Sequence, residues 1–314
     1  MSSAGAAFEA RYEGREVPLL EALDDERGAR GALDEAVFSP LLADIRFEVP
    51  EEASSRADPS DAWRAARLGQ VLRGGALEWS LTEEDVAALR VDDPAPLPDA
   101  FAALCAVRAA DGAAVDRGDF ELLLQAVTGP SGARLLGRFC HGDEALREHV
   151  RAHLRAEEAL RPDVVFAEVV HLPEGRMGNL VCRPLLRDWE IPFLGRSGAP
   201  REGQLPTQDL LLSVRAGRFV LRSASLGREV VPRMTSAHNF ELGDFRLYRL
   251  LCLLQWPSGL PGWRWGSMEQ AAFLPRVRIG RTVVSPARWR LVAGDLAPLA
   301  CPTPAARFAS VQRL

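Results

Sequence analysis

Lysine is absent from this chain of 314 residues: all 38 basic residues are arginines, set against 43 acidic residues, for a net charge of −5. A GC-rich genome would account for the choice of arginine, but not for the way the charges are distributed. Residues 1–100 hold 22 acidic residues and 10 arginines, a balance of −12, whereas residues 161–314 hold 12 acidic residues and 21 arginines, a balance of +9. A basic C-terminal half is what binding to a polyanion requires.

Cysteine is scarce, and its spacing excludes two kinds of small domain. The five cysteines are widely separated, odd in number and never form a C-x-x-C pair: Cys105, Cys140, Cys182, Cys252 and Cys301. This pattern argues against a disulfide framework and against a zinc ribbon. We expect buried, unreactive thiols.

Several familiar motifs are also missing. The sequence has no G-x-S-x-G elbow, no Walker A sequence and no G-x-G-x-x-G fingerprint. His149 and His153 have the spacing of a zincin helix, but no glutamate follows His149. The N-terminus lacks the apolar core of a signal peptide, and the longest apolar stretch, around residues 250–256, is far shorter than the roughly 20 residues that span a bilayer. The sequence therefore predicts a cytoplasmic protein with no membrane segment.

Residues 1–100 are predicted to be mainly helical. Pro18 suits the first turn of a short helix, and Asp61 precedes the helical pattern WRAARLGQVL. Thr82 begins another helix, with Asp85 three residues later in a pattern like a capping box. Residues 49–60 are predicted to form an exposed loop.

Residues 101–314 are predicted to be rich in strands. The segments FAALCAVRA, DFELLLQAV and ARLLGRF indicate antiparallel pairing around an Asp-Gly turn at residues 111–112, and a helix follows over about 143–160. A three-stranded meander is predicted to turn at residues 216–217 and 226–227, before a helix near 243–255 and a last β region containing RVRIGRTVV. The predicted class is α+β: a helical N-terminal third followed by a mixed, mainly antiparallel sheet with a few helices.

The most informative segment is Phe166–Pro192, FAEVVHLPEGRMGNLVCRPLLRDWEIP. It predicts two strands, joined by a Pro-Glu-Gly turn that delivers Arg176, Asn179 and Arg183 within eight residues. Two guanidinium groups beside an amide suit a phosphate or carboxylate partner. The residues alone are equally compatible with surface contacts of a turn.

This segment resembles the central part of the glutamyl-tRNA-dependent lantibiotic dehydratases, and four other stretches resemble the same family in the same order. The five stretches are ARYEGREVPLLEALDDERG (Ala10–Gly28), GPSGARLLGRF (Gly129–Phe139), Phe166–Pro192, LRSASLGREVVPRMTSAHNF (Leu221–Phe240) and FLPRVRIGRTVVSPARWRL (Phe273–Leu291). The resemblance places the chain in the interior of the family's N-terminal glutamylation domain. It implies that residues 1–100 and 101–314 are parts of that one domain, and that the chain is truncated at both ends.

The resemblance also implies an activity. Intact members of the family transfer glutamate from glutamyl-tRNA to Ser and Thr side chains of a ribosomal precursor peptide, and elimination then leaves dehydroamino acids in a lanthipeptide antibiotic. Glutamyl-tRNA is thus a co-substrate, no metal or other cofactor is implied, and the partners are the precursor peptide and a second subunit or homodimer. Whether this chain is an enzyme by itself is left open, because it resembles only part of one.

Four residues carry the implied chemistry. Attack on the aminoacyl ester develops an oxyanion, and the donor also has a carboxylate and phosphates, all of which suit Arg176, Asn179 and Arg183. Glu190 would orient these arginines or accept the proton of the attacking hydroxyl. A structural ion pair is the plainer interpretation of Glu190.

Five further residues are candidates for contacts with tRNA: Arg233, His238, Arg276, Arg278 and Arg281. Arg276 and Arg278 share one face of a predicted strand, with Val277 and Ile279 on the other. The plainer alternatives are a turn stabilised by His238 and a solvated strand edge. We expect the arginines of the C-terminal half to gather into one cationic pocket.

Other arrangements favour structural roles. Arg147, Arg151 and Arg155 form a helical stripe that local pairs with Glu144, Glu148 and Glu158 would explain. A tryptophan cluster, Trp256, Trp263 and Trp265, is expected to pack in a core or loop.

Two other functions fit the same sequence. One is an enzyme that adds an amino acid from an aminoacyl-tRNA to a peptide without elimination. The other is a non-catalytic module that binds tRNA or a partner subunit.

Overall fold

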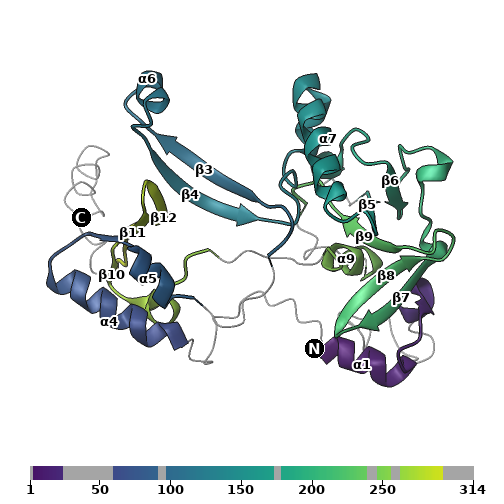
Figure 1. Ribbon diagram of the computed structural model, residues 1–314, viewed down its shortest axis with the longest axis horizontal. Coiled ribbons are helices and arrows are strands. Elements are labelled where there is room, and N and C mark those ends of the chain that lie inside the picture. Colours follow the sequence, from purple (N-terminus) through teal and green to yellow (C-terminus); the bar gives the residue numbers. More distant parts are fainter. Residues whose placement is uncertain are drawn as a thin grey trace, which may run out of the picture. The chain divides into compact units, whose positions relative to one another are not determined.

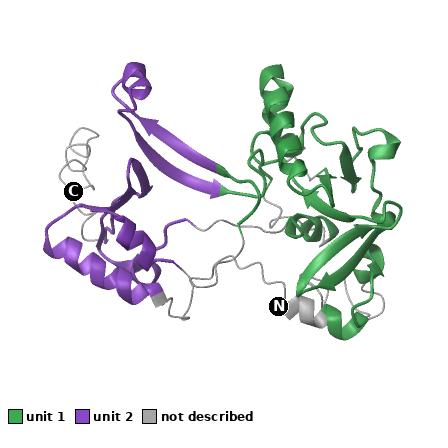
Figure 2. Ribbon diagram, viewed as in Figure 1, with its two compact units in different colours: residues 1–51, 96–102, 128–260 green, residues 52–95, 103–127, 261–314 purple. Residues whose placement is uncertain are grey.

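The computed structural model describes residues 3–23, 59–90, 97–172, 178–238, 246–255 and 262–292. The chain divides into two compact units, and each is built from three separate segments (Figure 2). Unit 1 comprises Met1–Glu51, Pro96–Ala102 and Thr128–Leu260, and unit 2 comprises Glu52–Ala95, Ala103–Val127 and Pro261–Leu314. The predicted division near residue 100 stays a prediction.

Unit 1 is a six-stranded mixed sheet with helices packed against it (Figure 1). Its strands are β1 (Val17–Pro18), β5 (Val165–Val170), β6 (Trp189–Pro192), β7 (Leu210–Arg215), β8 (Arg218–Ser223) and β9 (Glu229–Arg233), in the order β1-β7-β8-β9-β5-β6. Its α-helices are α1 (Ser3–Tyr12), α2 (Leu19–Ala22), α7 (Glu144–Ala159), α8 (Gly178–Val181) and α9 (Arg246–Leu253). Single 3₁₀ turns lie at Gly137–His141, Arg201–Gly203 and Thr207–Asp209.

The predicted meander is confirmed by β7, β8 and β9, which pair antiparallel in succession. The first turn consists of Ala216 and Gly217, with φ of 50° and 75°. Positive φ at both central positions matches the right-handed twist of the flanking strands. The second turn contains Gly227, whose φ of 66° suits a residue without a side chain.

The segment Phe166–Pro192 forms two strands as predicted, but they are parallel neighbours. Strand β5 pairs in parallel with β6 and with β9, so that Glu168 lies opposite both Glu190 and Arg233. Parallel strands reach the same edge of a sheet with their carboxyl ends. Three charged residues from distant parts of the sequence are thereby placed side by side across the sheet.

The main core lies on one face of this sheet. Alternate residues of the strands, such as Ala167, Ile191 and Leu221, pack there against apolar side chains of the helices, such as Phe8 and Leu251. These residues are 0–2% exposed. On the other face, Val164, Phe166 and Val231 form a smaller cluster, and Glu168, Glu190 and Arg233 share that face.

Unit 2 contains a five-stranded sheet of order β2-β11-β12-β4-β3 and the two-stranded sheet β10-β13. Its strands are β2 (Glu78–Ser80), β3 (Ala102–Arg108), β4 (Glu121–Thr128), β10 (Phe273–Leu274), β11 (Arg276–Ile279), β12 (Thr282–Ser285) and β13 (Arg288–Trp289). Its helices are α4 (Pro59–Arg73), α5 (Glu83–Ala88) and α6 (Gly112–Asp116), with a 3₁₀ turn at Gly266–Gln270. Trp79 is the centre of its core, with the rings of Trp263 and Trp265 at 5.5 and 6.1 Å. The core packing predicted for these two tryptophans is confirmed, while Trp256 lies outside the described residues.

The predicted α+β class is confirmed, and so is the capping box of α5. Thr82 accepts a hydrogen bond from the N–H of Asp85, whose carboxylate accepts one from the N–H of Thr82. Most of the loop predicted over residues 49–60 lies outside the described residues. In the described helices, none is long and apolar enough to cross a membrane.

Two local predictions were wrong. The Asp-Gly pair at 111–112 does not form a tight turn, because the Asp111 carboxylate accepts a hydrogen bond from the N–H of Ala114 and caps the short helix α6. The segment ARLLGRF is not a strand. Its N–H groups donate to carbonyls three residues earlier, and its last residues belong to the 3₁₀ turn Gly137–His141. A Cβ on Gly137 would lie 2.1 Å from the carbonyl oxygen of Thr235, so the backbone there must approach that chain closely.

Candidate functional site

The candidate site lies on the parallel strands β5, β6 and β9, on the sheet face opposite the main core. Glu168, Glu190 and Arg233 are adjacent in the ladder, and each is at most 4% exposed. Burying charged groups is unfavourable unless partners and hydrogen bonds compensate for the lost water. The partners of each residue therefore determine what the cluster can do.

Glu168 is fully compensated. It accepts a hydrogen bond from Arg183 Nε at 2.9 Å, and others from the N–H and the hydroxyl of Thr235. Arg187 Nε lies 3.5 Å from its second oxygen. Burial would raise the pKa of Glu168, but Arg183, Arg187 and the Thr235 N–H outweigh burial and hold that pKa below its ordinary value.

Arg183 is neutralised by two carboxylates. Besides Glu168, its Nη2 lies 3.4 Å from Glu190 Oε1, and its side chain is 9% exposed. Glu190 also accepts hydrogen bonds from the hydroxyl of Ser197 at 2.6 Å and from the N–H of Gly198 at 2.8 Å. The geometry makes Glu190 an orienting partner of Arg183, while Arg183 Nη2 is buried without a hydrogen bond of its own.

Arg187 is a member of the cluster that the sequence did not indicate. Its side chain is completely buried and lies against Glu157, Glu158 and Glu168. The pKa of Glu158 is raised because burial outweighs the opposing effect of Arg187. The only signal in the sequence is that Arg187 lies four residues after Arg183, in a segment already singled out.

Arg233 differs from both of these arginines. It is 4% exposed and lies over the ring of Phe166, 5.0 Å from its centroid. No carboxylate of the described residues lies within 4.0 Å of its guanidinium group. Burial and the like charge of Arg187 lower the pKa of Arg233 to about 10, so it stays a cation at neutral pH.

A small cavity adjoins Glu168 and Arg183. Its volume is about 30 Å³, the space of one water molecule, and His171, Ser236 and Tyr248 also line it. Beyond this lining, His238 Nδ1 lies 2.9 Å from the Tyr248 hydroxyl, and burial lowers the pKa of both histidines. The cavity is thus lined by a guanidinium and an imidazole, and a second imidazole contacts the Tyr248 hydroxyl.

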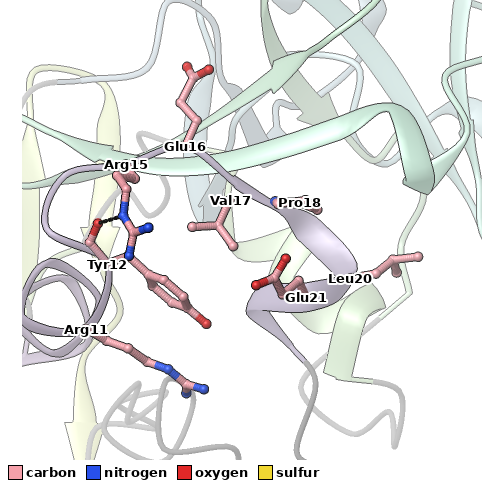
Figure 3. Close-up of a pocket in the computed structure, with 8 residues that line it drawn as sticks. All are labelled: Arg11, Tyr12, Arg15, Glu16, Val17, Pro18, Leu20 and Glu21. Carbon is pink, nitrogen blue, oxygen red and sulfur yellow. Dashed lines mark hydrogen bonds between the residues drawn. The ribbon is translucent and has the colours of Figure 1, made fainter. Parts of the chain in front are cut away.

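A larger cavity of about 750 Å³ lies at the N-terminal segment of unit 1 (Figure 3). Its lining is Arg11, Tyr12, Arg15, Glu16, Val17, Pro18, Leu20 and Glu21. Arg15 donates to the carbonyl of Tyr12 at 3.1 Å, and Glu16 is paired with Arg222. It contains none of the residues predicted for the chemistry, and Arg11, Arg15 and Glu21 are exposed. We place the candidate site at the buried cluster, because the predicted residues Arg183, Glu190 and Arg233 lie there and burial makes an unpaired charge unfavourable.

The structure locates the other predicted residues as follows. Arg176 lies outside the described residues, and Asn179 is exposed on α8. Arg183, Glu190, Arg233 and His238 all belong to unit 1 and are buried or nearly so.

Arg276, Arg278 and Arg281 belong to unit 2. Arg276 and Arg278 lie on one strand face as expected, but both contact Glu78, at 3.4 and 3.3 Å. Arg281 lies over the ring of Phe120. Within either unit, the described residues do not form the open cationic pocket that we expected, because Arg183, Arg276 and Arg278 each have carboxylate partners. Their roles toward tRNA stay predictions.

The helical stripe of α7 is paired locally in two of three cases. Arg147 contacts Glu144 and Arg151 contacts Glu148, as expected. The third predicted pair, with Glu158, is wrong, because Glu158 turns to Arg187 instead.

The cysteines follow the prediction only in part. Cys140 and Cys252 are buried, but Cys182 is exposed, with its Sγ 3.5 Å from His141 Nε2. Across the described ranges, no three His, Cys, Asp or Glu side chains gather as metal ligands would. The lack of a cofactor stays a prediction.

Comparison with known proteins identifies the family. The family described as "Lantibiotic dehydratase, N terminus" matches residues 3–314. Among solved structures, the chain is similar to the tRNA-dependent lantibiotic dehydratase MibB from Microbispora sp. 107891, with 28% identity and a TM-score of 0.74. No curated protein sequence matches the chain.

The fold is also similar to that of TbtB, the glutamylation domain from thiomuracin biosynthesis. One TbtB structure, bound to 5'-phosphodesmethylglutamycin, has 22% identity and a TM-score of 0.59, and another has 21% and 0.56. The matches cover 98–99% of this chain, but only 30% of MibB and 37–38% of the TbtB chains. The chain thus spans about a third of the proteins that it matches.

Proposed function

Because this chain belongs to the lantibiotic dehydratase N-terminus family, we propose that it forms part of a glutamylation unit, which transfers glutamate from glutamyl-tRNA to Ser or Thr of a precursor peptide. The observation that carries the proposal is the family match over residues 3–314, together with the likeness to MibB across nearly the whole chain. Since only 30% of MibB is covered, the activity is proposed for an assembly that includes this chain.

In the proposed reaction, the peptide hydroxyl oxygen attacks the ester carbonyl of the aminoacyl-tRNA. The bond from that carbonyl to the 3′ oxygen of the tRNA breaks, and the hydroxyl proton is passed on to the released 3′ oxygen. The products are a glutamyl ester of the peptide and free tRNA. Elimination of the glutamate in a later step would give the dehydroamino acid.

The buried cluster supports this chemistry by holding one guanidinium rigidly. Glu168 and Glu190 fix Arg183 from two sides, and its Nη2 has no hydrogen bond while Arg183 lines the cavity. A donor fixed in this way can stabilise an oxyanion without reorganising during the reaction. Arg176 and Asn179 are proposed to act with Arg183, as the family resemblance implies.

Proton transfer is assigned to the imidazole of His238. Burial lowers its pKa, so it is neutral at pH 7 and can accept a proton. The Tyr248 hydroxyl at 2.9 Å from its Nδ1 fixes the ring. The contact with tRNA expected for His238 stays a prediction beside this role.

The test is the yield of glutamyl ester in a complete, active assembly. Arg183→Ala would leave Glu168 and Glu190 buried without their common cation, so Arg183→Lys is the better variant because it keeps the charge and loses the second donor. Arg222→Met, which removes a partly exposed arginine of the same unit, is the matched control.

We expect Arg183→Lys to lose ester formation while its melting temperature stays near that of the wild type, and Arg222→Met to keep it. Normal ester yield in Arg183→Lys would remove the cluster from the catalytic account. The mass of the modified peptide distinguishes this reaction from that of the alternative enzyme, which adds an amino acid without elimination. Dehydration lowers the peptide mass by one water molecule, whereas ligation raises it by one amino-acid residue. Salt-dependent tRNA binding without any transfer would instead favour a binding module.

The proposal includes glutamyl-tRNA and a precursor peptide as partners, within a homodimer or with a partner subunit. It also places the reaction in the cytoplasm, where aminoacyl-tRNA is found.

A further inference from the structure

Arg233 is a buried cation with no carboxylate within 4.0 Å among the described residues, although Glu157 and Asp99 favour its charge from further away. Among the residues that the structure describes, its buried Nε has no hydrogen-bond partner, and its Nη1 donates only to the carbonyl of the preceding Pro232, at 3.2 Å. A guanidinium has five N–H donors, so most of its capacity is unused. Nη2 makes no hydrogen bond to a described residue, so its donors are available to a ligand.

The neighbouring arginines show that the cluster supplies carboxylates where the fold needs them. Arg187 is completely buried and contacts three glutamates, and Arg183 contacts two. Arg233 lies in the same cluster, opposite Glu168 in the ladder, yet Glu168 is directed to Arg183, Arg187 and Thr235. Within this cluster, Arg233 thus differs from Arg183 and Arg187 in having no close carboxylate partner among the described residues.

We propose that Arg233 binds a carboxylate of a ligand and, resting on the proposed function, that this is the free side-chain carboxylate of the glutamyl group. Arg233 would thereby select glutamate over glutamine as the group to be transferred. A ligand carboxylate bound to this guanidinium would balance its single positive charge, which no described carboxylate does at close range. Phe166, which covers one face of the guanidinium, leaves its edge for that contact.

Size favours a carboxylate over an RNA phosphate. Only 4% of Arg233 is exposed, so a group must reach it on a slender chain. A phosphodiester carries a ribose on each side, whereas a glutamyl side chain ends in a carboxylate on two methylene groups. Burial therefore assigns Arg233 to the amino acid and not, as the sequence suggested, to the tRNA backbone.

The position fits a site for both ends of one small group. Neighbouring strands lie about 5 Å apart, so the backbone of Arg233 is that far from Glu168. Glu168 in turn contacts Arg183 and lines the cavity. The proposal therefore places the carbonyl end of the aminoacyl group at Arg183 and its carboxylate end at Arg233, two arginines linked through Glu168.

The first experiment measures binding in this chain alone, with sodium glutamate as the probe and glutamine as its neutral analogue, at constant ionic strength. We expect the melting temperature of the wild type to rise with glutamate and not with glutamine. Arg233→Met should remove this response, and Arg222→Met should keep it. Without any probe, Arg233→Met should melt no lower than the wild type, because it removes a buried charge that has no carboxylate within 4.0 Å among the described residues.

Two results would overturn the proposal. One is that Arg233→Met lowers the melting temperature while the wild type does not respond to glutamate, which would make Arg233 a structural residue. The other is an equal, Arg233-dependent response to inorganic phosphate, which would make it a general phosphate site. Neither readout requires transfer activity, so failure of the proposed function would leave this test intact.

The second experiment uses the complete, active assembly with tRNA charged with glutamate or glutamine. We expect Arg233→Met to raise the KM for glutamyl-tRNA roughly 10- to 100-fold, the loss of one charged hydrogen-bonding contact, and to leave the KM for glutaminyl-tRNA unchanged. A fall in kcat for both substrates with unchanged selectivity would contradict a role in choosing the amino acid.

Discussion

Arg187→Met is expected to destabilise unit 1 strongly, because the arginine is completely buried among three glutamates. After the substitution, Glu168 keeps Arg183 and Thr235, and Glu157 keeps His153 at 2.8 Å. Glu158 keeps no partner among the described residues, although 28% of its side chain is exposed. Breaking a buried pair costs about 3–5 kcal/mol, and the partners that remain place this variant at about 3 kcal/mol.

The measurement is chemical and thermal unfolding of the chain. A loss of about 3 kcal/mol corresponds to a fall of roughly 6–12 °C in the melting temperature of a unit of this size. Arg222→Met is the control: its pair with Glu16 is partly exposed, and we expect it to cost about 1 kcal/mol or less. Equal losses in the two variants would refute the claim that burial sets the value of the ion pair.

The pH dependence gives a second signature. Burial already raises the pKa of Glu158 above 4.5 against the opposing effect of Arg187, so removing Arg187 raises that pKa further. Between the ordinary and the raised value, the folded variant binds more protons than its unfolded chain, and its stability therefore increases as pH falls. The difference between wild type and Arg187→Met should shrink from pH 7 to pH 5, and a constant difference would contradict this account.

Three further predictions concern single side chains. Burial lowers the pKa of His238 below 6.5, so the unfolded chain binds more protons than the folded one, and stability should fall as pH drops below about 6.5. His238→Gln should reduce this pH dependence in denaturant titrations at pH 7 and pH 5. An unchanged pH dependence would exclude His238 as its cause. Cys182 is exposed whereas Cys140 and Cys252 are buried, so peptide mapping after brief maleimide treatment should find more adduct on Cys182 than on either buried thiol, and equal labelling of these three would contradict their burial. Thr82→Ala removes the capping box of α5 and should lower the free energy of unfolding of unit 2 by about 1 kcal/mol, a change that denaturant titration would detect or refute.

Features set by neighbouring residues were predictable from the sequence. The capping box at Thr82 needs only residues three positions apart, and the turn at Ala216 and Gly217 needs only two central residues flanked by strand patterns. Helix α7 follows from its apolar spacing and its cap at Asp143. In these places local preference and tertiary structure agree.

Features set by distant residues were not predictable. Nothing in the pattern of β5 shows that it pairs in parallel with β9 and β6, since a buried strand has the same composition in either direction. The segment containing Arg183 could be singled out, but its pairing with Glu168 and Glu190 and the burial of Arg187 follow from that sheet. The same is true of Arg276, whose partner Glu78 is nearly two hundred positions away in the sequence.

The segmented composition of the two units has a practical consequence for anyone cloning pieces of this gene. The polypeptide passes from one unit to the other five times, between residues 51 and 52, 95 and 96, 102 and 103, 127 and 128, and 260 and 261. No single cut in the reading frame separates them, and an expressed piece that begins after β1 lacks the strand that covers β7. Isolating either unit requires rejoining three stretches of coding sequence with new linkers.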